Sequence, residues 1–246
     1  MRKKNLLIAG SQGLIGTDLV DLFSKSDEYN IELMDIQLGT DFTNQVSVEN
    51  AFKDLSQSGF KIEYIINSFG KNHHIDKNEN PSQVKIDEKD IIKDLNKLEN
   101  EVIYDYFNVN VMAIYNLVKG AIQFHSKSLK SFTTLGSLYS DSQPFHPLYD
   151  EPKSLGYVIS KHSLVGLNNY LASYFGKYGI RFNIVSPGCI ISNQSDIFKG
   201  QLISRTPMGR LSVAEDLFGL LKLLSSEGSQ YMTGLNIKVD GGLSLY

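Results

Sequence analysis

Length, composition and charge fit one globular domain. The chain has 246 residues, of which 41% are hydrophobic and 21% are charged, so it is able to bury a core and is not disordered in bulk. The formal net charge of −3 shows no basic excess and argues against nucleic acid as the main partner. The single cysteine, Cys189, excludes an internal disulfide framework and a cysteine-rich metal site.

The first residues do not predict a targeting segment. Met1 to Lys4 include three basic residues, but the apolar run behind them, Leu6 to Ala9, is short and ends in a glycine-rich turn. No stretch approaches the ~20 apolar residues of a membrane span. We therefore expect a cytoplasmic protein that has no membrane partner.

A glycine-rich turn follows the first predicted strand. The wholly apolar run Leu6 to Ala9 is typical of a strand buried on both faces of a parallel sheet. Gly10, Gly13 and Gly16 come next, at a spacing that permits a tight turn, a close approach of backbone N–H groups to a pyrophosphate and close packing of the helix that follows. The residues between these glycines, which the same interpretation places at the pyrophosphate, are Ser11, Gln12, Leu14 and Ile15.

Two acidic residues follow in positions where adenosine binds in dinucleotide folds. Asp35 ends the predicted strand from Ile31 to Met34, about twenty residues beyond the glycines, where a carboxylate accepts hydrogen bonds from a ribose. An ordinary aspartate at a strand end is the alternative. Asp41, followed by Phe42, stands at the expected tip of a third strand, where a carboxylate meets the adenine edge.

The next predicted strand, Ile62 to Ile66, ends in Asn67-Ser68-Phe69-Gly70. The following segment, 71–100, is polar and charged, and its part from 86 to 98 fits an amphipathic helix. His73 and His74 are adjacent in it, so a helix or a strand would splay them apart. With no carboxylate cluster to complete a site, we expect no bound metal.

Two further polar positions lie in apolar surroundings. Asn110 stands inside a long helical pattern, Val102 to Phe124, where the alternative to a functional role is an amide bonded to its own backbone. Ser137 follows the predicted strand from Ser131 to Leu135. A loop containing proline and serine then extends from 138 to 153.

Tyr157 and Lys161 are four residues apart in the next predicted helix, so their side chains lie one above the other. A tyrosine titrates near 10 in a model peptide, and a nearby ammonium favours its anion. The pair thus predicts a proton shuttle for an alcohol or a carbonyl, with a pKa of Tyr157 pulled down by Lys161. The same spacing also fits a surface lysine that packs on an aromatic ring.

The last part of the chain completes an alternation of strands and helices. A strand, Phe182 to Val185, leads to Pro187-Gly188, and a polar loop from Asn193 to Arg205 follows. A helix is expected from about Val213 to Leu224 and a final strand from Leu235 to Val239. The alternation predicts one right-handed, doubly wound parallel α/β sheet with helices on both faces and no domain boundary.

Together these segments resemble the short-chain dehydrogenase/reductase family over nearly the whole length. The resemblance rests on the glycine loop, Asp41, Asn67-Ser68-Phe69-Gly70, Asn110, Ser137, Tyr157/Lys161, Pro187-Gly188, Thr233-Gly234 and Val239-Asp240-Gly241-Gly242, which stand in the family's order. It implies a Rossmann-like fold and hydride transfer between a nicotinamide cofactor and an alcohol or carbonyl. The small-molecule substrate would lie under a lid at about 193–209.

The resemblance also implies roles for individual residues. Tyr157 would be the acid or base, Ser137 would orient the substrate oxygen, Lys161 would bind the nicotinamide ribose and lower the pKa of Tyr157, and Asn110 would hold a water. Further cofactor contacts would come from Ile36, Ile190 and Ser192, beside the residues already named. Asp35 favours NAD(H) over NADP(H), because a carboxylate repels a 2′-phosphate and no basic residue follows it.

The sequence departs from the family pattern at several places. The glycines are spaced as in the family's extended branch, although the chain length and the C-terminal motif are those of the classical branch. Phe69 brings bulk into a motif that usually reads Asn-Asn-Ala-Gly, and Ser192 replaces a threonine. The stretch between Asn67 and Asn110 is long, which places an insertion at 71–100. The loop before Tyr157 is also long, and it makes Ser140 and Ser142 rivals of Ser137.

Within the family, the long loop and the run from Tyr170 to Arg181 resemble oxidoreductases of bacterial surface-sugar biosynthesis, including those associated with legionaminic-acid-type sugars. A sugar phosphate or a nucleotide sugar is then the expected substrate. The alternatives are an NAD-dependent epimerase or dehydratase and a dinucleotide-binding regulator without turnover. The wide apolar stripes of the helices at 102–124 and 157–178 predict a homodimer or homotetramer, since such helices pair across a two-fold axis in this family. Arg205 is expected to meet a substrate phosphate or carboxylate, or else to be a solvated surface arginine.

Overall fold

One parallel sheet organises the chain in the computed structural model, which describes residues 2–72, 100–149 and 153–245. Within these residues six strands lie in the order β2-β1-β3-β4-β5-β6, and all neighbours are parallel. Their bounds are Lys4–Ala9 (β1), Tyr29–Met34 (β2), Tyr64–Asn67 (β3), Ser131–Leu135 (β4), Arg181–Pro187 (β5) and Asn236–Val239 (β6). The predicted doubly wound α/β fold is therefore confirmed.

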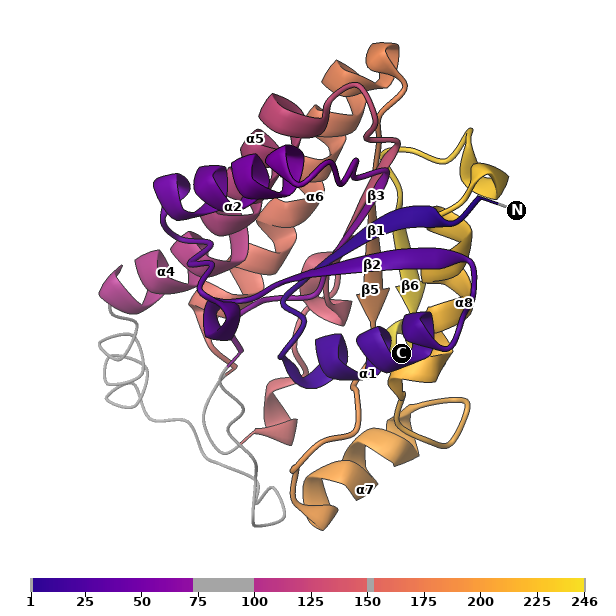
Figure 1. Ribbon diagram of the computed structural model, residues 1–246. Helices are drawn as coiled ribbons and strands as arrows, with labels where there is room; N and C mark the ends of the chain where they lie inside the picture. The colour runs from indigo at the N-terminus through magenta and orange to yellow at the C-terminus, as the bar shows by residue number, and fades with distance from the viewer. Residues whose placement is uncertain (1, 73–99, 150–152, 246) are drawn as a thin grey trace.

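Helices cover both faces of the sheet (Figure 1). One face carries α2 (Gln45–Gln57), α5 (Ala113–His125) and α6 (Leu155–Phe175), and the other carries α1 (Leu14–Ser24) and α8 (Ala214–Leu224). Successive residues of β1 alternate between the two layers, so that Leu7 and Ala9 pack with α2 and α5 while Leu6 and Ile8 pack with α1 and α8. All four are fully buried, which explains why the first strand is apolar at every position.

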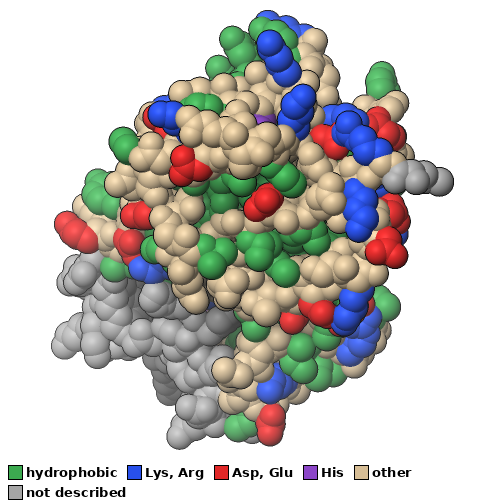
Figure 2. All heavy atoms as spheres, viewed as in Figure 1, with side chains coloured by type: hydrophobic (Ala, Val, Ile, Leu, Met, Phe, Trp, Pro, Cys, Tyr) green, Lys and Arg blue, Asp and Glu red, His purple; other side chains and the backbone are tan. Residues whose placement is uncertain are grey.

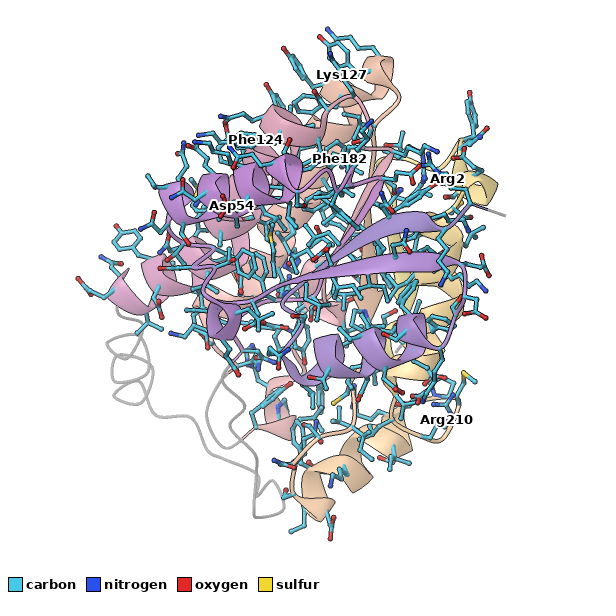
Figure 3. The ribbon with its side chains drawn as sticks, viewed as in Figure 1. Arg2, Asp54, Phe124, Lys127, Phe182 and Arg210 are labelled. Carbon is cyan, nitrogen blue, oxygen red and sulfur yellow. The ribbon has the colours of Figure 1, made fainter. Side chains whose placement is uncertain are left out.

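Phe182 of β5 shows how tightly the first layer is filled. Its ring is 1% exposed and stacks on Phe132 of β4 with the ring centroids 5.8 Å apart. Figure 3 places it in the interior, between the sheet and the helices that cover this face. Burial of such large rings is worth roughly 2–3 kcal/mol each and fixes β4 against β5, and thus the strand ends that build the site.

Side-chain caps set where several helices begin. Asn44 Oδ1 accepts hydrogen bonds from the amides of Val46 and Ser47 at the start of α2, at 3.0 and 3.2 Å. Ser154 Oγ accepts from the Tyr157 amide at the start of α6. Such caps stabilise a helix by about 1 kcal/mol and fix its first residue. The cap at Ser154 therefore sets the position of Tyr157 along its helix.

The long helix predicted from Val102 to Phe124 is present but interrupted. It consists of α4 (Asn100–Phe107), the π-helical turn η2 (Asn108–Met112) and α5. Asn110 lies in the π turn and is fully buried. Such a turn adds one residue to a helical repeat and often marks a functional site. It changes the direction in which the Asn110 side chain points relative to a regular helix.

The expectation of a strand that ends at Asp41 is wrong. Met34 is followed by the short 3-10 turn η1 (Ile36–Leu38), and Gly39 then takes a left-handed conformation at φ 94°. The Asp35 side chain accepts a hydrogen bond from the Gln37 amide and so starts this turn. Because Gly, Asp and Asn follow in the next residues, the segment favours turns over a strand. Among the described residues β2 is one of the two edge strands of the sheet, and hydrophobic side chains gather on the face of the molecule shown in Figure 2.

The expectation of a polar loop from Asn193 to Arg205 is also wrong, because most of this segment is the helix α7 (Asp196–Arg205). Ser195 Oγ accepts from the Phe198 amide and caps its start. Phe198 and Leu202, one turn apart, are 2% and 4% exposed and pack in a third apolar cluster with Leu148. These two side chains anchor one face of α7, although Ile197 and Ile203 remain exposed.

The remaining described elements are short 3-10 turns. They are η3 (Leu138–Ser140), η4 (His146–Leu148), η5 (Gly176–Tyr178), η6 (Glu227–Ser229) and η7 (Leu243–Leu245). No helix within the described ranges is long and apolar enough to cross a bilayer. The helix expected at 86–98, His73, His74 and nearly all of the insertion at 71–100 lie outside the described residues.

Candidate functional site

The carboxyl ends of five neighbouring strands meet around a cavity of about 540 Å³. Gly10 follows β1, Asp35 follows β2, Ser68 follows β3, Ser137 follows β4 and Gly188 follows β5, and all five residues line the cavity. Ligands in open parallel α/β sheets bind at this edge, outside the carboxyl ends of the strands. Residues far apart in the sequence are thus brought together by the topology.

Most of the predicted site residues line this cavity. Those that do are Gly10, Gln12, Gly13, Leu14, Ile15, Asp35, Ile36, Ser68, Phe69, Gly70, Ser137, Tyr157, Lys161, Pro187, Gly188 and Ile190. Those that do not are Ser11, Gly16, Asp41, Phe42, Asn67, Asn110 and Ser192. The second group divides into residues that support the lining and residues that lie away from it.

The glycine loop is packed so closely that side chains would not fit. Gly10 has φ +80°, and a Cβ there would lie 2.4 Å from the Phe69 nitrogen. A Cβ on Gly16 would lie 2.0 Å from the Gly10 carbonyl oxygen, which explains why Gly16 supports the loop from behind. The helix α1 starts after Gly13 without a side-chain cap. Its first N–H groups, which have no partner within the helix, are therefore at the cavity, and N–H groups of this kind can bind a phosphate.

The Asp35 carboxylate follows β2 and lines the cavity beside the glycine loop. The residue is 6% exposed, and its carboxylate accepts hydrogen bonds from the Gln12 amide and the Gln37 amide, each at 3.0 Å. The first of these bonds ties the strand end to the glycine loop. A carboxylate oxygen has two lone pairs, so each oxygen still accepts one bond from a ligand hydroxyl.

Phe42 and Asp41 lie outside the cavity in different ways. The Phe42 ring stacks on Phe69 with centroids 4.2 Å apart, so it backs a ring that does line the cavity. The Asp41 carboxylate instead accepts hydrogen bonds from the backbone amide and the hydroxyl of Thr43, at 2.9 and 2.7 Å. Ser192 also faces away, and its amide donates to Gln194 Oε1. Asp41 and Ser192 therefore take structural hydrogen bonds where ligand contacts were predicted.

Two buried polar atoms beside the cavity have no hydrogen-bond partner among the described residues. Ser11 Oγ and Asn67 Nδ2 make no hydrogen bond, although both residues are 1% exposed or less. Unpaired buried polar atoms are uncommon. Ser11 lies between Gly10 and Gln12, and Asn67 precedes Ser68, so both adjoin residues of the lining. The closely packed glycine loop, the uncapped α1 and the Asp35 carboxylate together fit a nicotinamide dinucleotide.

The four residues of the expected catalytic set lie close together. The Ser137 side chain lies close enough to the Tyr157 hydroxyl to lower the pKa of Tyr157, and both residues line the cavity. Lys161 Nζ is 5.8 Å from the centroid of the Tyr157 ring and donates to the Leu135 carbonyl at 3.4 Å. Asn110 stands one layer back, where it accepts from the Lys71 amide at 2.7 Å and donates to the Ser160 hydroxyl at 2.9 Å. Asn110 thus holds the loop after β3 against α6.

The pKa values of the central pair differ from expectation. Burial raises the pKa of Tyr157 to about 12, against the hydrogen bond from Ser137, which lowers it. Burial also lowers the pKa of Lys161 to about 8. The prediction that the pKa of Tyr157 lies below its usual value is therefore wrong for the protein as described, because the loss of water around the phenol raises the pKa by more than Ser137 lowers it.

The geometry separates Ser137 from its two rivals. Ser140 Oγ accepts from the Ser137 amide at 3.1 Å and closes the η3 turn, while its own residue is 2% exposed. Ser142 Oγ donates to Asp141. Ser137 alone of the three lines the cavity.

Several residues of the cavity lining were not predicted from the sequence, and three of them belong to one loop. Tyr139, Tyr149 and Lys153 all come from the long loop before Tyr157 and line the cavity. The hydroxyls of Tyr139 and Tyr149 are 2.7 Å apart. No spacing rule marks these positions, since the loop is irregular. Only the unusual length of the loop was a signal that it builds part of the site.

Arg205 does not reach the cavity lining. Its guanidinium lies 3.8 Å from the centroid of the Phe145 ring, a cation–π contact at the end of α7. The helix contributes Phe198 and Leu202 to the cavity wall in its place. The apolar face of α7 therefore contacts the cavity, and its basic end does not.

Comparison with known proteins identifies the family. A sequence profile of the family described as enoyl-(acyl carrier protein) reductase matches residues 24–244, which is most of the chain. The chain belongs to the short-chain dehydrogenase/reductase family, whose members are NAD(P)-dependent oxidoreductases of CH–OH and C=O groups.

Its relatives share the fold and differ in substrate. The chain is 27% identical to a 3-oxoacyl-(acyl-carrier-protein) reductase of Haemophilus influenzae over 61% of this chain and 62% of that protein. It is 28% identical to a 7alpha-hydroxysteroid dehydrogenase of Paraclostridium sordellii over 89% of this chain and 71% of that one. A crystal structure of a short chain dehydrogenase from Leptospira borgpetersenii with bound NAD+ covers 99% of this chain and 94% of its own, at 25% identity and a TM-score of 0.81.

Proposed function

We propose that the chain is an NAD(H)-dependent oxidoreductase that interconverts an alcohol and a carbonyl, with Tyr157 as the proton donor or acceptor. The observation that carries the proposal is the meeting of Tyr157, Ser137 and Lys161 with the glycine loop around one cavity. A nicotinamide cofactor, when bound, supplies or accepts the hydride. The protein's own side chains then have to bind, orient and move one proton.

That proton passes through Tyr157. In the reducing direction the phenol donates its proton to the substrate oxygen, and in the oxidising direction the phenolate takes it back. The Ser137 hydroxyl, which lines the cavity beside this phenol, orients the same oxygen. Because burial raises the pKa of Tyr157 to about 12, the phenol is protonated at neutral pH, which is the form that reduction requires.

Asp35 supports a preference for NAD(H) over NADP(H). Its buried carboxylate lies beside the glycine loop, and Ile36 and Gln37 follow it in the cavity lining. A 2′-phosphate placed there meets a like charge and no basic partner from these residues, at a cost of several kcal/mol. The affinities of the two reduced cofactors, measured by calorimetry, test the preference.

The finer proposal concerns the substrate. We propose a sugar phosphate or a nucleotide sugar of bacterial surface-glycan biosynthesis, such as the legionaminic-acid-type sugars. Its support is the long loop after β4, which adds the polar groups of Tyr139, Tyr149 and Lys153 to the cavity. Several hydroxyls and an ammonium suit a hydrated, hydroxyl-rich substrate better than a hydrocarbon.

Three further proposals accompany this function. The protein works in the cytoplasm.

The helix α7, with the residues around 193–209, closes over the substrate. Hydrogen exchange tests this closure, because α7 should be more protected in the presence of NADH and substrate. The chain forms a homodimer or homotetramer through α4, α5 and α6, where large side chains are exposed, and light scattering measures the mass. These side chains are Tyr104, Met112, Tyr115, Tyr170 and Tyr174.

Incubation with NADH and a panel of carbonyl compounds, followed at the nicotinamide absorbance, tests the proposed function. Net oxidation of NADH that is lost in Tyr157→Phe and kept in Tyr178→Phe, an exposed tyrosine on η5, is the expected result. An epimerase or dehydratase would convert a nucleotide sugar with no net change in NADH. A dinucleotide-binding regulator would bind NADH and convert nothing.

A further inference from the structure

Two tyrosines of the loop after β4 form a hydrogen-bonded pair on the wall of the cavity. The hydroxyls of Tyr139 and Tyr149 are 2.7 Å apart, and both residues line the cavity. One hydroxyl donates its hydrogen to the other, so the second O–H of the pair needs a different acceptor. Among the described residues neither hydroxyl has another hydrogen-bond partner. The pair therefore offers a ligand one donor, and lone pairs that accept.

The pair lies beside the tyrosine to which the proton transfer is assigned. The Tyr139 ring packs edge-on against the Tyr157 ring, with the centroids 6.3 Å apart. Tyr139 is held there by the η3 turn, because its amide donates to Ser137 Oγ at 3.2 Å. Tyr149 is also near Tyr157, since Lys153 Nζ contacts both rings, at 5.7 and 4.7 Å from their centroids. A substrate whose reacting oxygen lies at Tyr157 and Ser137 therefore has its next atoms near the pair.

The surroundings of the pair are apolar. Phe198 and Leu202 of α7 and Leu243 of η7 line the same cavity and belong to one cluster with Tyr149. Tyr149 is 8% exposed, and its ring centroid lies 5.5 Å from that of Phe198. A hydrogen bond gains strength in such surroundings, and a donor left without an acceptor is costly there. A substrate that places hydrocarbon against the pair leaves the donor unpaired, whereas a substrate oxygen satisfies it.

Both phenols are neutral near pH 7. Burial raises the pKa of Tyr139, against the hydrogen bond with Tyr149, which lowers it. Burial also raises the pKa of Tyr149 well above its usual value. Neither hydroxyl therefore releases its proton near neutral pH, and the pair takes part by hydrogen bonding and not as a second acid or base.

We infer that the Tyr139–Tyr149 pair determines specificity by binding a hydroxyl group on the carbon next to the reacting carbon. A hydroxyl both accepts and donates, which matches a pair that offers one O–H and lone pairs. The substrate is then an α-hydroxy carbonyl compound in the reducing direction and a vicinal diol in the oxidising direction. The inference rests on the proposed function, because it places this hydroxyl relative to the oxygen on which Tyr157 acts.

Matched ketones that differ in this one hydroxyl test the inference. At saturating NADH, acetoin is compared with butanone, and adipoin, the α-hydroxy form of cyclohexanone, with cyclohexanone. Because a hydroxyl also changes the reactivity of a ketone, the ratio of the two kcat/KM values is compared between proteins. We expect this ratio to fall roughly tenfold to hundredfold in Tyr139→Phe/Tyr149→Phe, the range for a buried donor left unpaired by the plain ketone. Tyr178→Phe, exposed on η5, is the control and should keep the wild-type ratio.

Single variants and a binding measurement complete the test. Tyr139→Phe and Tyr149→Phe each keep one O–H, so at least one of them should lower the ratio, but by less than the double variant does. By calorimetry on NADH-saturated protein, vicinal cyclohexanediol should bind more tightly than cyclohexanol to wild type, and this difference should disappear in the double variant.

The outcomes separate the inference from the proposed function. A ratio unchanged in the double variant, or in both single variants if the double variant does not fold, would overturn the inference and leave the proposed function in place. A wild-type protein that binds NADH and reduces none of the ketones would contradict the proposed function, and the inference with it.

Discussion

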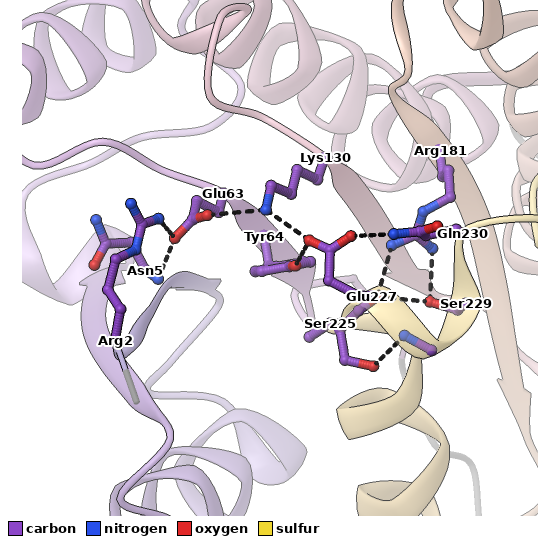
Figure 4. Close-up of polar contacts among 12 residues, drawn as sticks. Arg2, Asn5, Glu63, Tyr64, Lys130, Arg181, Ser225, Glu227, Ser229 and Gln230 are labelled. Atoms are coloured by element: carbon purple, nitrogen blue, oxygen red, sulfur yellow. Dashed lines mark hydrogen bonds and ion pairs between the residues drawn. The ribbon is translucent and has the colours of Figure 1, made fainter.

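Charged side chains lie at both ends of the parallel sheet. Those at the amino ends of the strands form ion pairs, whereas Lys161 at the carboxyl ends is buried among uncharged groups. At the amino ends of the strands, Glu63, Lys130 and Glu227 form a chain of ion pairs that also includes Arg2 (Figure 4). At the carboxyl ends, Lys161 is buried beside a tyrosine and a carbonyl. The first group has its charges matched within the protein, whereas the second does not.

The pKa directions record this difference. Hydrogen bonds from Lys130 and Gln230 hold the pKa of Glu227 down at about 2. Burial tends to raise the pKa of Glu63, but the Asn5 amide together with Arg2 and Lys130 brings it below its usual range. At the carboxyl ends of the strands burial is the main cause of both shifts. It lowers the pKa of Lys161 to about 8 and raises the pKa of Tyr157 to about 12. One end of the sheet is built for stability, and the other keeps groups in states that a bound ligand can use.

Removing Lys161 should give the largest effect and the clearest contrast. We expect Lys161→Met to lower turnover by ~10²–10⁴, the range for loss of a group in a proton relay. The same change should leave the free energy of unfolding unchanged or raise it, because a desolvated cation is replaced by an apolar chain of similar length. NADH oxidation and urea denaturation measure the two quantities. A destabilised Lys161→Met protein would show that Lys161 is structural.

The pH dependence of the stability of Lys161→Met tests whether the pKa of Lys161 is lowered by burial. Lys161 titrates at about 8 in the folded chain and near 10.5 when unfolded, so the unfolded state binds more protons between these values. Wild-type stability should therefore rise relative to Lys161→Met from pH 8 to pH 10.5. Below pH 8 the burial cost is fully present and the difference should be constant. Parallel curves across the whole range would contradict the lowered pKa.

Arg181 is the matching test at the amino end. This residue, 7% exposed, donates to Ser229 Oγ at 2.8 Å and to the Leu224 carbonyl at 3.1 Å. Arg181→Met should lower the free energy of unfolding by roughly 2–4 kcal/mol, since each buried acceptor left without a donor costs ~1–3 kcal/mol. Turnover at a temperature where the variant is folded should stay within about twofold of wild type. Arg2→Met, whose side chain is 78% exposed, should cost at most about 1 kcal/mol.

A substitution at Asp35, at the carboxyl ends of the strands, should have a smaller effect, which is on the choice of cofactor. Asp35→Asn keeps the shape and removes the charge, so the ratio of NADH affinity to NADPH affinity should fall by about tenfold or more. Asp41→Asn is the matched control, because Asp41 lies outside the cavity and bonds to Thr43. Calorimetry with both cofactors gives the two ratios. If Asp41→Asn changes the ratio and Asp35→Asn does not, the adenosine site is at Asp41.

The smallest expected effect is the contribution of Glu227 to the loss of stability at low pH. Its pKa is depressed from 4.5 to about 2, so its stabilising contribution is present above pH 4.5 and is lost as pH falls towards 2. The side chain is 53% exposed, so solvent screening keeps the effect small. Between pH 4.5 and pH 2, Glu227→Gln should show a shallower loss of melting temperature than wild type. Identical slopes would mean that the ion pair contributes nothing.

The sequence predicted what depends on local pattern. Apolar runs such as Leu6 to Ala9 predict buried strands, and polar residues directly after such runs lie at the ligand edge of a parallel sheet. Asp35 was placed for this reason, whereas the site positions of Ser137 and Gly188 came from the family resemblance. The family resemblance gave roles to Tyr157 and Lys161 that spacing alone left open.

What the sequence did not predict depends on tertiary packing. The helix α7 has a largely polar sequence. Its buried face consists of Phe198 and Leu202, and this face can be recognised only once the fold shows that both side chains are buried. The π turn at Asn110 leaves no mark in the apolar periodicity. Lys153 reads as an ordinary loop lysine until the fold places it at Tyr157. The pKa of Tyr157 was predicted in the wrong direction, since the number of water molecules lost around a side chain is not a property of its neighbours in sequence.

NADH oxidation by Tyr157→Phe tests the central claim most directly. This change removes one hydroxyl from a buried ring and leaves the contacts of the ring with Tyr106 and Tyr139 in place. At saturating NADH and substrate, the account predicts turnover lower by ~10²–10⁴, with NADH affinity and melting temperature close to wild type. Turnover close to wild type in a protein that binds NADH normally would contradict the assignment of Tyr157 and the function proposed for the cavity.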